Sequence, residues 1–209
     1  MIVVVERHNA AKYADLVDKM LRLRARIFHQ QLKWNVHVAN GKERDKYDDA
    51  APVYIIYTDD DCREAKGSLR LLPTTGPTLL ADFFADTLPD AVDLTAPTIW
   101  ECTRFCFDDQ ILATRREHVL FASAVVLIAL SDVAIRAGIE SIIANFNESM
   151  LQFYRLLGCE VEILGSTSRH GEPVYLGLHP ISETLVGKEK PEDRPGGVFG
   201  STARGRLSD

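Results

Sequence analysis

The stretch from residue 99 to residue 146 constrains the fold most, because a long, largely apolar helix pattern stands there between two predicted strands. IWECTRFCF (99–107) is rich in apolar and aromatic residues and predicts a strand. The pattern from Arg115 to Ala137 is helical and largely apolar, and Gly138 ends it. SIIANF (141–146) predicts a further strand. A chain that places a long apolar helix between two strands has to pack that helix on a sheet.

Further elements are predicted on both sides of this stretch. Before it, we expect a strand at 2–6, a helix at 10–32, a polar loop at 35–52, strands at 53–59 and 68–72 joined by a hairpin turn, and a short helix within 73–91. After it, we expect a helix at 148–158 and strands at 159–165 and 173–180. This order predicts a single α+β domain, residues 1–186, with a mixed, mostly antiparallel sheet flanked by helices. Residues 187–209 are rich in Pro, Gly and charge, which predicts a flexible tail.

Composition excludes several classes of function. The net charge of −6 argues against non-specific nucleic-acid binding. We find no apolar run that approaches the roughly 20 residues of a membrane span. The start, MIVVVERHNAAKY, lacks the basic region of a signal peptide. The four cysteines form no CxxC pair, and we expect them to be reduced thiols. We therefore expect a cytoplasmic protein whose partners are neither nucleic acid nor membrane.

Charged residues stand at positions where a core would be apolar, and these positions are the informative exceptions. Each also fits a plain structural role: an exposed helix charge, a solvated acidic run, or an ion pair between Arg70 and Glu101 on neighbouring strands. Together with nearby aromatic residues they could instead form one polar pocket for a ligand with an amine, a carboxylate and a flat ring. The set comprises Arg24, Phe28 and Trp34 at the end of the first helix, Glu43, Asp45 and Asp48 in the polar loop, Arg70, and Glu101 and Arg104.

Strand alternation sets a condition on such a pocket. On a regular strand Glu101 and Thr103 face one side of the sheet and Arg104 faces the other. Glu101 and Arg104 can serve one cavity only if the strand bends, so we predict a β-bulge here, where the sheet splays.

In these residues the sequence resembles the acyl-homoserine-lactone synthases, the LuxI-type autoinducer synthases of quorum sensing. The recurring set of that family appears here as Arg24, Phe28, Trp34, Glu43, Asp45, Asp48, Arg70 in GSLRLLPTTGPTLL, Phe84, and Glu101 and Arg104 in ECTRFC. The order and spacing of these residues agree with those of the family from residue 24 to residue 107. The resemblance implies a fold like that of the GCN5-type N-acetyltransferases, which agrees with the α+β order predicted above.

The resemblance also implies a reaction. An acyl group carried by acyl carrier protein would join the amino group of S-adenosylmethionine, and lactonisation would then release 5′-methylthioadenosine, with no cofactor and no metal. We expect Glu101 to act as the base, Thr103 and the neighbouring backbone N–H groups to stabilise the thioester oxygen, and Arg104 to bind a carboxylate. The expected S-adenosylmethionine site comprises Arg24, Phe28, Trp34, Asp45, Asp48, Arg70, Arg104 and Phe105.

Two further surfaces are expected on the acyl-donor side. The acyl chain needs an apolar pocket, for which the candidates, which could equally be plain core, are Val125, Val126, Ala129, Ile142, Ala144, Phe146, Met150 and Phe153. Family members that favour 3-oxo chains carry a threonine near Ala144 or Asn145, so its absence disfavours a 3-oxo preference. Acyl carrier protein is acidic, and the candidates for docking it, which could equally be scattered surface charge, are Arg115, Arg116, Arg155 and Arg169.

The identity of the acyl donor depends on a missing motif. Acetyltransferases hold the pyrophosphate of CoA on a glycine-rich helix start, whereas DDQILATRREHV (108–119) contains no glycine. This absence favours a carrier-protein donor over the alternative, a CoA-dependent N-acyltransferase acting on another amine. A second alternative is a non-catalytic module that binds S-adenosylmethionine or an acyl chain, which release of 5′-methylthioadenosine would exclude.

Overall fold

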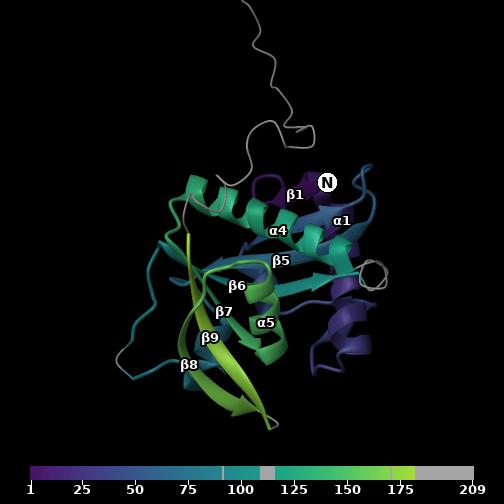
Figure 1. The fold of residues 1–209 in the computed structure, drawn as a ribbon. Helices are drawn as coiled ribbons and strands as arrows, with labels where there is room; N and C mark the ends of the chain where they lie inside the picture. The colour runs from purple at the N-terminus through teal and green to yellow at the C-terminus, as the bar shows by residue number, and fades with distance from the viewer. Residues whose placement is uncertain (91, 109–115, 170, 182–209) are drawn as a thin grey trace, which may run out of the picture.

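The protein is built on one seven-stranded sheet (Figure 1). The computed structural model describes residues 1–90, 92–108, 116–169 and 171–181, without the side chains of residues 116 and 117. All neighbouring strands are antiparallel except β6 and β7, which are parallel, so the predicted mixed, mostly antiparallel sheet is confirmed. In spatial order the strands are β1 (Ile2–Val5), β4 (Val53–Thr58), β5 (Ala65–Pro73), β6 (Ile99–Phe107), β7 (Ser141–Asn147), β9 (Glu172–Pro180) and β8 (Glu162–Arg169).

Most predicted elements are present, with shifted ends. Strand β5 begins three residues before the predicted SLRLL, and β8 lies three to four residues beyond the predicted 159–165. The polar loop contains a two-stranded hairpin and a 3₁₀ turn that the sequence pattern did not predict. The loop elements are β2 (Val38–Ala39), β3 (Lys42–Glu43) and the 3₁₀ helix η3 (Lys46–Asp49). The end of the domain at residue 186 and the tail from residue 187 lie outside the described residues.

The predicted helix at 10–32 is helical throughout but changes its pitch twice. It comprises the 3₁₀ helix η1 (Ala10–Tyr13), the α-helix α1 (Ala14–Arg24) and the π-helix η2 (Ala25–Gln31). The wider π turns carry Phe28, and π segments are frequent at functional sites. The other helices in the described part of the chain are α2 (Leu79–Phe83), the 3₁₀ helix η4 (Ala85–Thr87), α4 (Arg116–Ala137) and α5 (Glu148–Leu156).

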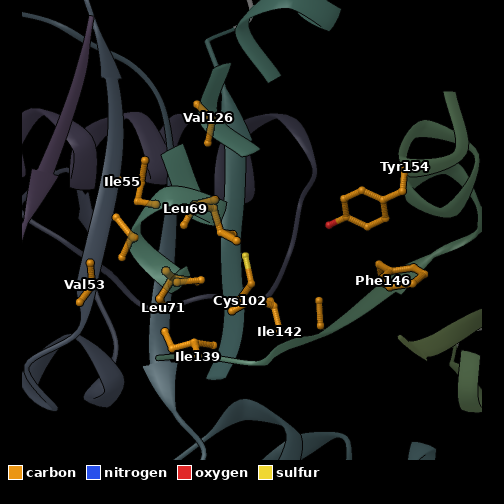
Figure 2. Packing of buried hydrophobic residues seen from close by; sticks show 14 of the residues in the cluster. Val53, Ile55, Leu69, Leu71, Cys102, Val126, Ile139, Ile142, Phe146 and Tyr154 are labelled. Atoms are coloured by element: carbon orange, nitrogen blue, oxygen red, sulfur yellow. The ribbon is translucent and has the colours of Figure 1, made fainter. Parts of the chain in front are cut away.

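Helix α4 covers one face of the sheet (Figure 1). Its residues from His118 to Ala137 have a mean hydropathy of 2.2 and are long and apolar enough to cross a membrane, by length and composition only. The expectation that no apolar run has this length was therefore wrong. Its buried side chains pack on Leu69, Leu71 and Cys102 of the sheet, as Figure 2 shows for Val126. Packing on a sheet is the behaviour of a core helix, and it accounts for the buried apolar side chains of α4, whereas Phe121 and Ile128 are exposed.

The opposite face of the sheet is covered in two parts. Side chains of α1 and η2, among them Met20 and Phe28, pack on one half with Tyr54 and Ile56 of β4. Leu80 of α2 packs on the other half with Ile143 and Leu176. Neighbouring residues of a strand point to opposite faces, so this face is distinct from the one under α4. The boundary between the two parts runs along β6.

Candidate active site

A β-bulge in β6 brings the charged side chains of the strand to one face. Ser68 of β5 pairs with Cys106 and Arg70 pairs with Thr103, so β6 holds one extra residue between these pairs. Arg104 has a φ of +57°, which a non-glycine residue rarely adopts. The extra residue resets the alternation, and Glu101, Thr103 and Arg104 share the face that α1 and α2 cover. The predicted bulge is confirmed.

The sheet divides at the same place. The parallel ladder between β6 and β7 consists of Ile99↔Ser141, Trp100↔Ile142 and Glu101↔Ile143. Both strands continue beyond it, β6 to Phe107 and β7 to Asn147, without further pairing between them. The seven strands therefore form two halves, β1-β4-β5-β6 and β7-β9-β8, joined by this short ladder and by the apolar cluster under α4 and α5, which contains residues of both halves.

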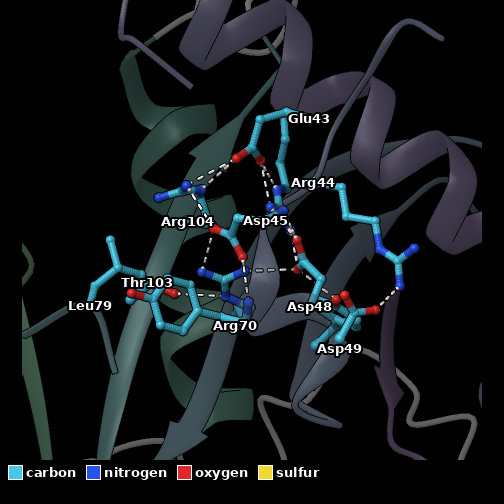
Figure 3. A network of polar contacts seen from close by, with 12 residues as sticks. Glu43, Arg44, Asp45, Asp48, Asp49, Arg70, Leu79, Thr103 and Arg104 are labelled. Carbon is cyan, nitrogen blue, oxygen red and sulfur yellow. Dashed lines mark hydrogen bonds and ion pairs between the residues drawn. The ribbon is translucent and has the colours of Figure 1, made fainter. Parts of the chain in front are cut away.

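Three arginines and three carboxylates form a closed ring in which the charges alternate (Figure 3). Arg24 donates to Glu43 Oε2 at 2.5 Å and to both carboxylate oxygens of Asp48 at 2.8 and 2.9 Å. Arg70 donates to Asp48 Oδ1 at 2.9 Å and to both oxygens of Asp45 at 2.5 and 3.0 Å. Arg104 closes the ring, with Nη2 donating to Glu43 Oε1 and to Asp45 Oδ2, both at 2.9 Å.

Most of this ring is buried, which excludes the alternative of a solvated acidic loop. Glu43 and Arg70 are fully buried and Arg24 is 1% exposed. Burial opposes the charge of Asp48, but hydrogen bonds and charge from Arg24, with the charge of Arg70, hold the pKa of that carboxyl well below its usual range. Burial likewise opposes the charged guanidinium of Arg24, yet Asp48 and Glu43 raise its pKa. The ring is formally neutral, and each buried charge has two partners, as a stable buried network requires.

The ring is open to solvent on the side of Arg104 and Asp45. Their side chains are 11% and 17% exposed, whereas the other four are at most 1% exposed. Nη1 of Arg104 makes no hydrogen bond to any residue that the structure describes. The Arg104 guanidinium lies 5.5 Å from the centre of the Phe28 ring, and Phe28 stacks on Trp34 at 5.0 Å. Trp34 is 49% exposed. This side offers a free donor, an acidic acceptor and an aromatic face.

Glu101 does not pair with Arg70, so that structural alternative is wrong. Its carboxylate accepts hydrogen bonds from the backbone N–H of Leu79 at 2.9 Å and of Leu80 at 2.7 Å, at the start of α2. Burial raises the pKa of Glu101, because its effect exceeds those of the two N–H donors and of the charges on Arg70 and Arg104. The side chain of Thr103 accepts a hydrogen bond from Arg70 Nε at 3.0 Å.

The expected acyl-pocket residues lie mainly under α4 and α5, on the other face of the sheet. Val126, Ile142, Ala144 and Phe146 belong to one buried cluster, and Ala129 and Met150 pack at its edge. Val125 and Phe153 are partly buried outside it. Phe105 also packs against this cluster, 5.3 Å from Phe107, and not with the arginines. Of the two residues considered near the position of the family threonine, Ala144 faces this cluster, whereas Asn145 points to the other face and donates to Thr87 Oγ1 at 3.0 Å.

The four expected docking arginines are not equivalent. Arg115 and the side chain of Arg116 lie outside the described residues. Arg155 is exposed near the end of α5. Arg169 is bound to α2 and η4: its Nη2 donates to the carbonyl of Phe83 and, at 2.6 Å, to Asp86, and its guanidinium lies 4.8 Å from the centre of the Phe84 ring.

Two tyrosines support the ring and were missed in the sequence. Tyr54 donates to Asp48 Oδ1 at 2.7 Å, and Tyr47 donates to Asp82 Oδ2 of α2 at 2.6 Å. Both are buried. For Tyr47 there was a signal, because an aromatic residue between Asp45 and Asp48 has little reason to stand in a solvated run. For Tyr54 there was none, since a tyrosine in a strand is ordinary.

Comparison with known proteins gives a consistent family. A model of the autoinducer synthase family matches residues 7–188. An acyl-homoserine-lactone synthase of Rhizobium etli is 36% identical over 166 residues, covering 79% of this chain and 77% of that protein. The corresponding enzyme of Agrobacterium fabrum is 30% identical over 179 residues, covering 84% of this chain and 83% of that protein.

Solved structures agree on the fold. BjaI, a CoA-dependent acyl-homoserine lactone synthase solved with SAM and isopentyl-CoA, has a TM-score of 0.80 at 24% identity, covering 89% of this chain and 85% of that one. TofI, solved with an inhibitor and MTA, has a TM-score of 0.73 at 26% identity, covering 89% and 94%. A putative N-acetyltransferase from Lactobacillus plantarum has a TM-score of 0.55 at 16% identity, covering 87% and 99%. The fold is therefore the acyltransferase fold that the sequence predicted.

Proposed function

This chain belongs to the autoinducer synthase family of acyltransferases, and from that premise we propose that it acylates S-adenosylmethionine and closes the product to an N-acyl-homoserine lactone. The observation that carries the proposal is the open side of the charge ring. Nη1 of Arg104 and the carboxylate of Asp45 stand beside the stacked rings of Phe28 and Trp34. S-Adenosylmethionine has the matching groups: a carboxylate, an ammonium and a sulfonium next to a flat base.

Binding of the amino acid part follows from charge. The substrate carboxylate accepts from Arg104, and its ammonium donates to Asp45. The sulfonium is a cation, so it is favoured near the face of Phe28 or Trp34. Arg24, Arg70 and Asp48 have their hydrogen bonds to other ring residues, to Thr103, to Tyr54 and to the backbone of Asp45, so their role is to hold Arg104 and Asp45 in place. The presence of SAM in the BjaI structure supports the choice of ligand.

The first chemical step is acylation of the amine. Glu101, directly or through a water, takes a proton from the substrate ammonium, and the freed nitrogen attacks the thioester carbonyl carbon. The carbonyl oxygen becomes negative, and we propose that backbone N–H groups around Thr103 to Phe105 donate to it. The end of the β6–β7 ladder at Glu101 supports this choice. The C–S bond then breaks, the amide remains, and the thiol of the donor leaves with a proton.

The second step is closure of the ring. The substrate carboxylate attacks the methylene carbon attached to the sulfonium, the C–S bond breaks, and 5′-methylthioadenosine leaves with the electron pair. No cofactor or metal is needed for either step, which stays a prediction. A cytoplasmic location also stays a prediction, and the four free thiols support it.

For the acyl donor we propose acyl-acyl carrier protein. The absence of glycine from residues 108–119 supports it, since a CoA pyrophosphate is usually held by glycine-rich backbone. The specific observation that favours CoA as the second candidate is the CoA dependence of BjaI.

A donor panel tests both statements. The enzyme is mixed with S-adenosylmethionine and the same acyl group as a carrier-protein thioester or a CoA thioester, and lactone and 5′-methylthioadenosine are followed by mass spectrometry. We expect equal amounts of the two products and a higher kcat/KM with the carrier-protein thioester. A higher kcat/KM with CoA would establish the second candidate, and no product from any donor would refute the proposed function.

A further inference from the structure

Residues 79–87, which comprise α2 and η4 and are here called the strap, contact both halves of the divided sheet. The two halves are also joined through the short ladder between β6 and β7 and through the apolar cluster on the opposite face. The strap packs on the face that also carries the charge ring. Its contacts are specific at both ends, and they connect Glu101 with a distant arginine.

The first end of the strap is held by the half that carries the ring. The backbone N–H groups of Leu79 and Leu80 donate to the two oxygens of Glu101. Asp82 accepts from Tyr47 at 2.6 Å and pairs with Lys46 at 2.7 Å, which ties the strap to η3. The orientation of the Glu101 carboxylate and the position of the strap therefore depend on each other.

The second end of the strap is held by β7 and β8. Arg169, the last residue of β8, donates to the carbonyl of Phe83 and to Asp86 and covers the ring of Phe84. Asn145 of β7 donates to Thr87. Gly165 of β8 lies so close that a Cβ there would be 2.2 Å from the Thr87 carbonyl oxygen. A side chain at residue 165 would force this end away from the sheet.

We propose that Arg169 is a positioning residue, which holds the strap against β8 and thereby fixes the two N–H groups that orient Glu101. This role replaces the expected role of Arg169 in docking the carrier protein. The Arg169 side chain is 38% exposed, and its guanidinium is held by Phe83, Phe84 and Asp86 of the strap. The kinetic consequence rests on the proposed function, because it is expressed through Glu101 as the base.

The test compares Arg169→Gln with Arg136→Gln. Arg136 also pairs with an aspartate at the surface, Asp132 of α4, but does not contact the strap. Amide hydrogen exchange over residues 79–87 is measured first, without substrate. We expect Arg169→Gln to accelerate exchange at Leu79 and Leu80 by at least about tenfold and Arg136→Gln to leave it unchanged.

Kinetic measurements then distinguish a positioning role of Arg169 from a role in docking the carrier protein. With carrier-protein and CoA thioesters alike, Arg169→Gln should lower kcat by about tenfold to a hundredfold, as a displaced catalytic group does, with KM for S-adenosylmethionine within twofold. Arg169→Lys should recover part of kcat. Asp86→Asn should resemble Arg169→Gln, and the double variant should be no worse than either single variant.

The opposite results would overturn the proposal. Unchanged exchange at Leu79 and Leu80, together with an increase in KM for the carrier-protein thioester alone, would return Arg169 to the docking surface. If the wild-type enzyme made no lactone from any donor, the proposed function would fail while the exchange result still decided whether Arg169 holds the strap. If Arg169→Gln did not fold, Arg169→Lys and Asp86→Asn would be compared by the same exchange measurement.

Discussion

At the scale of single residues, Glu101 carries the greatest chemical demand. It is 1% exposed, yet in the proposed role of base it would have to take up a proton and release it again in each turnover. Two backbone N–H groups and two neighbouring arginines favour its charged form, and burial disfavours it more strongly. A carboxyl group in this balance suits proton transfer better than an exposed one, because its pKa is nearer to neutral pH.

Replacing Glu101 with Gln should strongly reduce turnover without abolishing the binding of S-adenosylmethionine. The amide cannot take a proton, and the contacts proposed for S-adenosylmethionine involve other residues. We expect kcat to fall by at least about a hundredfold, a usual contribution of a general base. Calorimetric affinity for S-adenosylmethionine should stay within about threefold. A variant with a near-normal rate of 5′-methylthioadenosine release would remove Glu101 from the mechanism.

The dependence of the rate on pH should report the same carboxyl group. The base has to be ionised, and burial raises the pKa of Glu101, so activity should be lost on acidification at a higher pH than an exposed glutamate would give. We expect the acid limb of the kcat/KM profile for S-adenosylmethionine to give an apparent pKa above the usual glutamate value of about 4.3. A profile that stayed flat down to that pH would contradict the assignment.

At the scale of elements, the acidic loop is the part whose order depends most on charge. Its short hairpin and 3₁₀ turn bury few apolar side chains, and its carboxylates are fixed by Arg24, Arg70 and Arg104. Asp48 receives two donors from Arg24, one from Arg70, one from Tyr54 and one from the backbone of Asp45. Without that carboxylate two buried guanidinium groups would each lose a partner.

Asp48→Asn should therefore be strongly destabilising at neutral pH. We expect a loss of about 3 to 5 kcal/mol in the free energy of unfolding, as for other broken buried ion pairs. Urea denaturation measures it, and Asp49→Asn is the matched control, since Asp49 is exposed and should change stability by less than about 0.5 kcal/mol. Equal effects of the two variants would contradict a structural role for the ring.

The same pair of variants makes a prediction for acid. The folded pKa of Asp48 lies below the unfolded value of about 3.9. Its stabilisation is therefore present above that pH and is lost as the pH falls towards the folded value. Wild type should lose more stability than Asp48→Asn between pH values of about 6 and 3. If the unfolding free energies of the two proteins fell in parallel with pH, folding would not lower the pKa of Asp48.

At the scale of the whole molecule, the proposed mechanism gives the two faces of the divided sheet different roles. The charge ring lies on the face under α1 and α2, whereas the apolar cluster under α4 and α5 lies on the other face. The place where β6 and β7 part is the boundary that both faces share. An amine held on one side and an acyl chain held on the other would meet there, at the bulge.

Placement of the acyl chain under α4 and α5 can be tested at Ala144. This residue is buried in the apolar cluster, so Ala144→Leu should fill space that a long chain needs. We expect the chain-length profile, measured by mass spectrometry over thioesters of increasing length, to shift to shorter chains. Ala137→Leu, at the exposed end of α4, is the control. An unchanged profile for Ala144→Leu would place the acyl chain elsewhere.

The sequence predicted the site best where charged residues stood in an otherwise apolar strand pattern. Glu101 and Arg104 on an apolar strand were sufficient to predict the bulge, because no regular strand could use both. The ring partners were also foreseeable, since buried arginines need carboxylates. Elements were predictable where an apolar segment was long and clearly ended, as for α4, which Gly138 follows.

The features that the sequence did not predict depend on contacts between residues that are distant in the chain. No local signal shows that the oxygens of Glu101 point to α2, or that Arg169 binds Asp86. The hairpin β2–β3 is too short to have a period, and the π turns of η2 follow from packing and not from helix propensity. Arg169 was assigned to docking because a sequence does not distinguish a free arginine from a bound one.

The most direct test of the charge ring as a binding site is a calorimetric titration of S-adenosylmethionine into wild type, Arg104→Gln and Arg104→Lys. Nη1 of Arg104 is the free donor of the ring, and a lost charge-assisted hydrogen bond weakens binding by about 1.5 to 3 kcal/mol. We predict a Kd at least about tenfold higher for Arg104→Gln, partial recovery in Arg104→Lys, and no change in Arg44→Gln, a neighbouring exposed arginine. Wild-type affinity in a folded Arg104→Gln would contradict the claim that this ring binds the substrate.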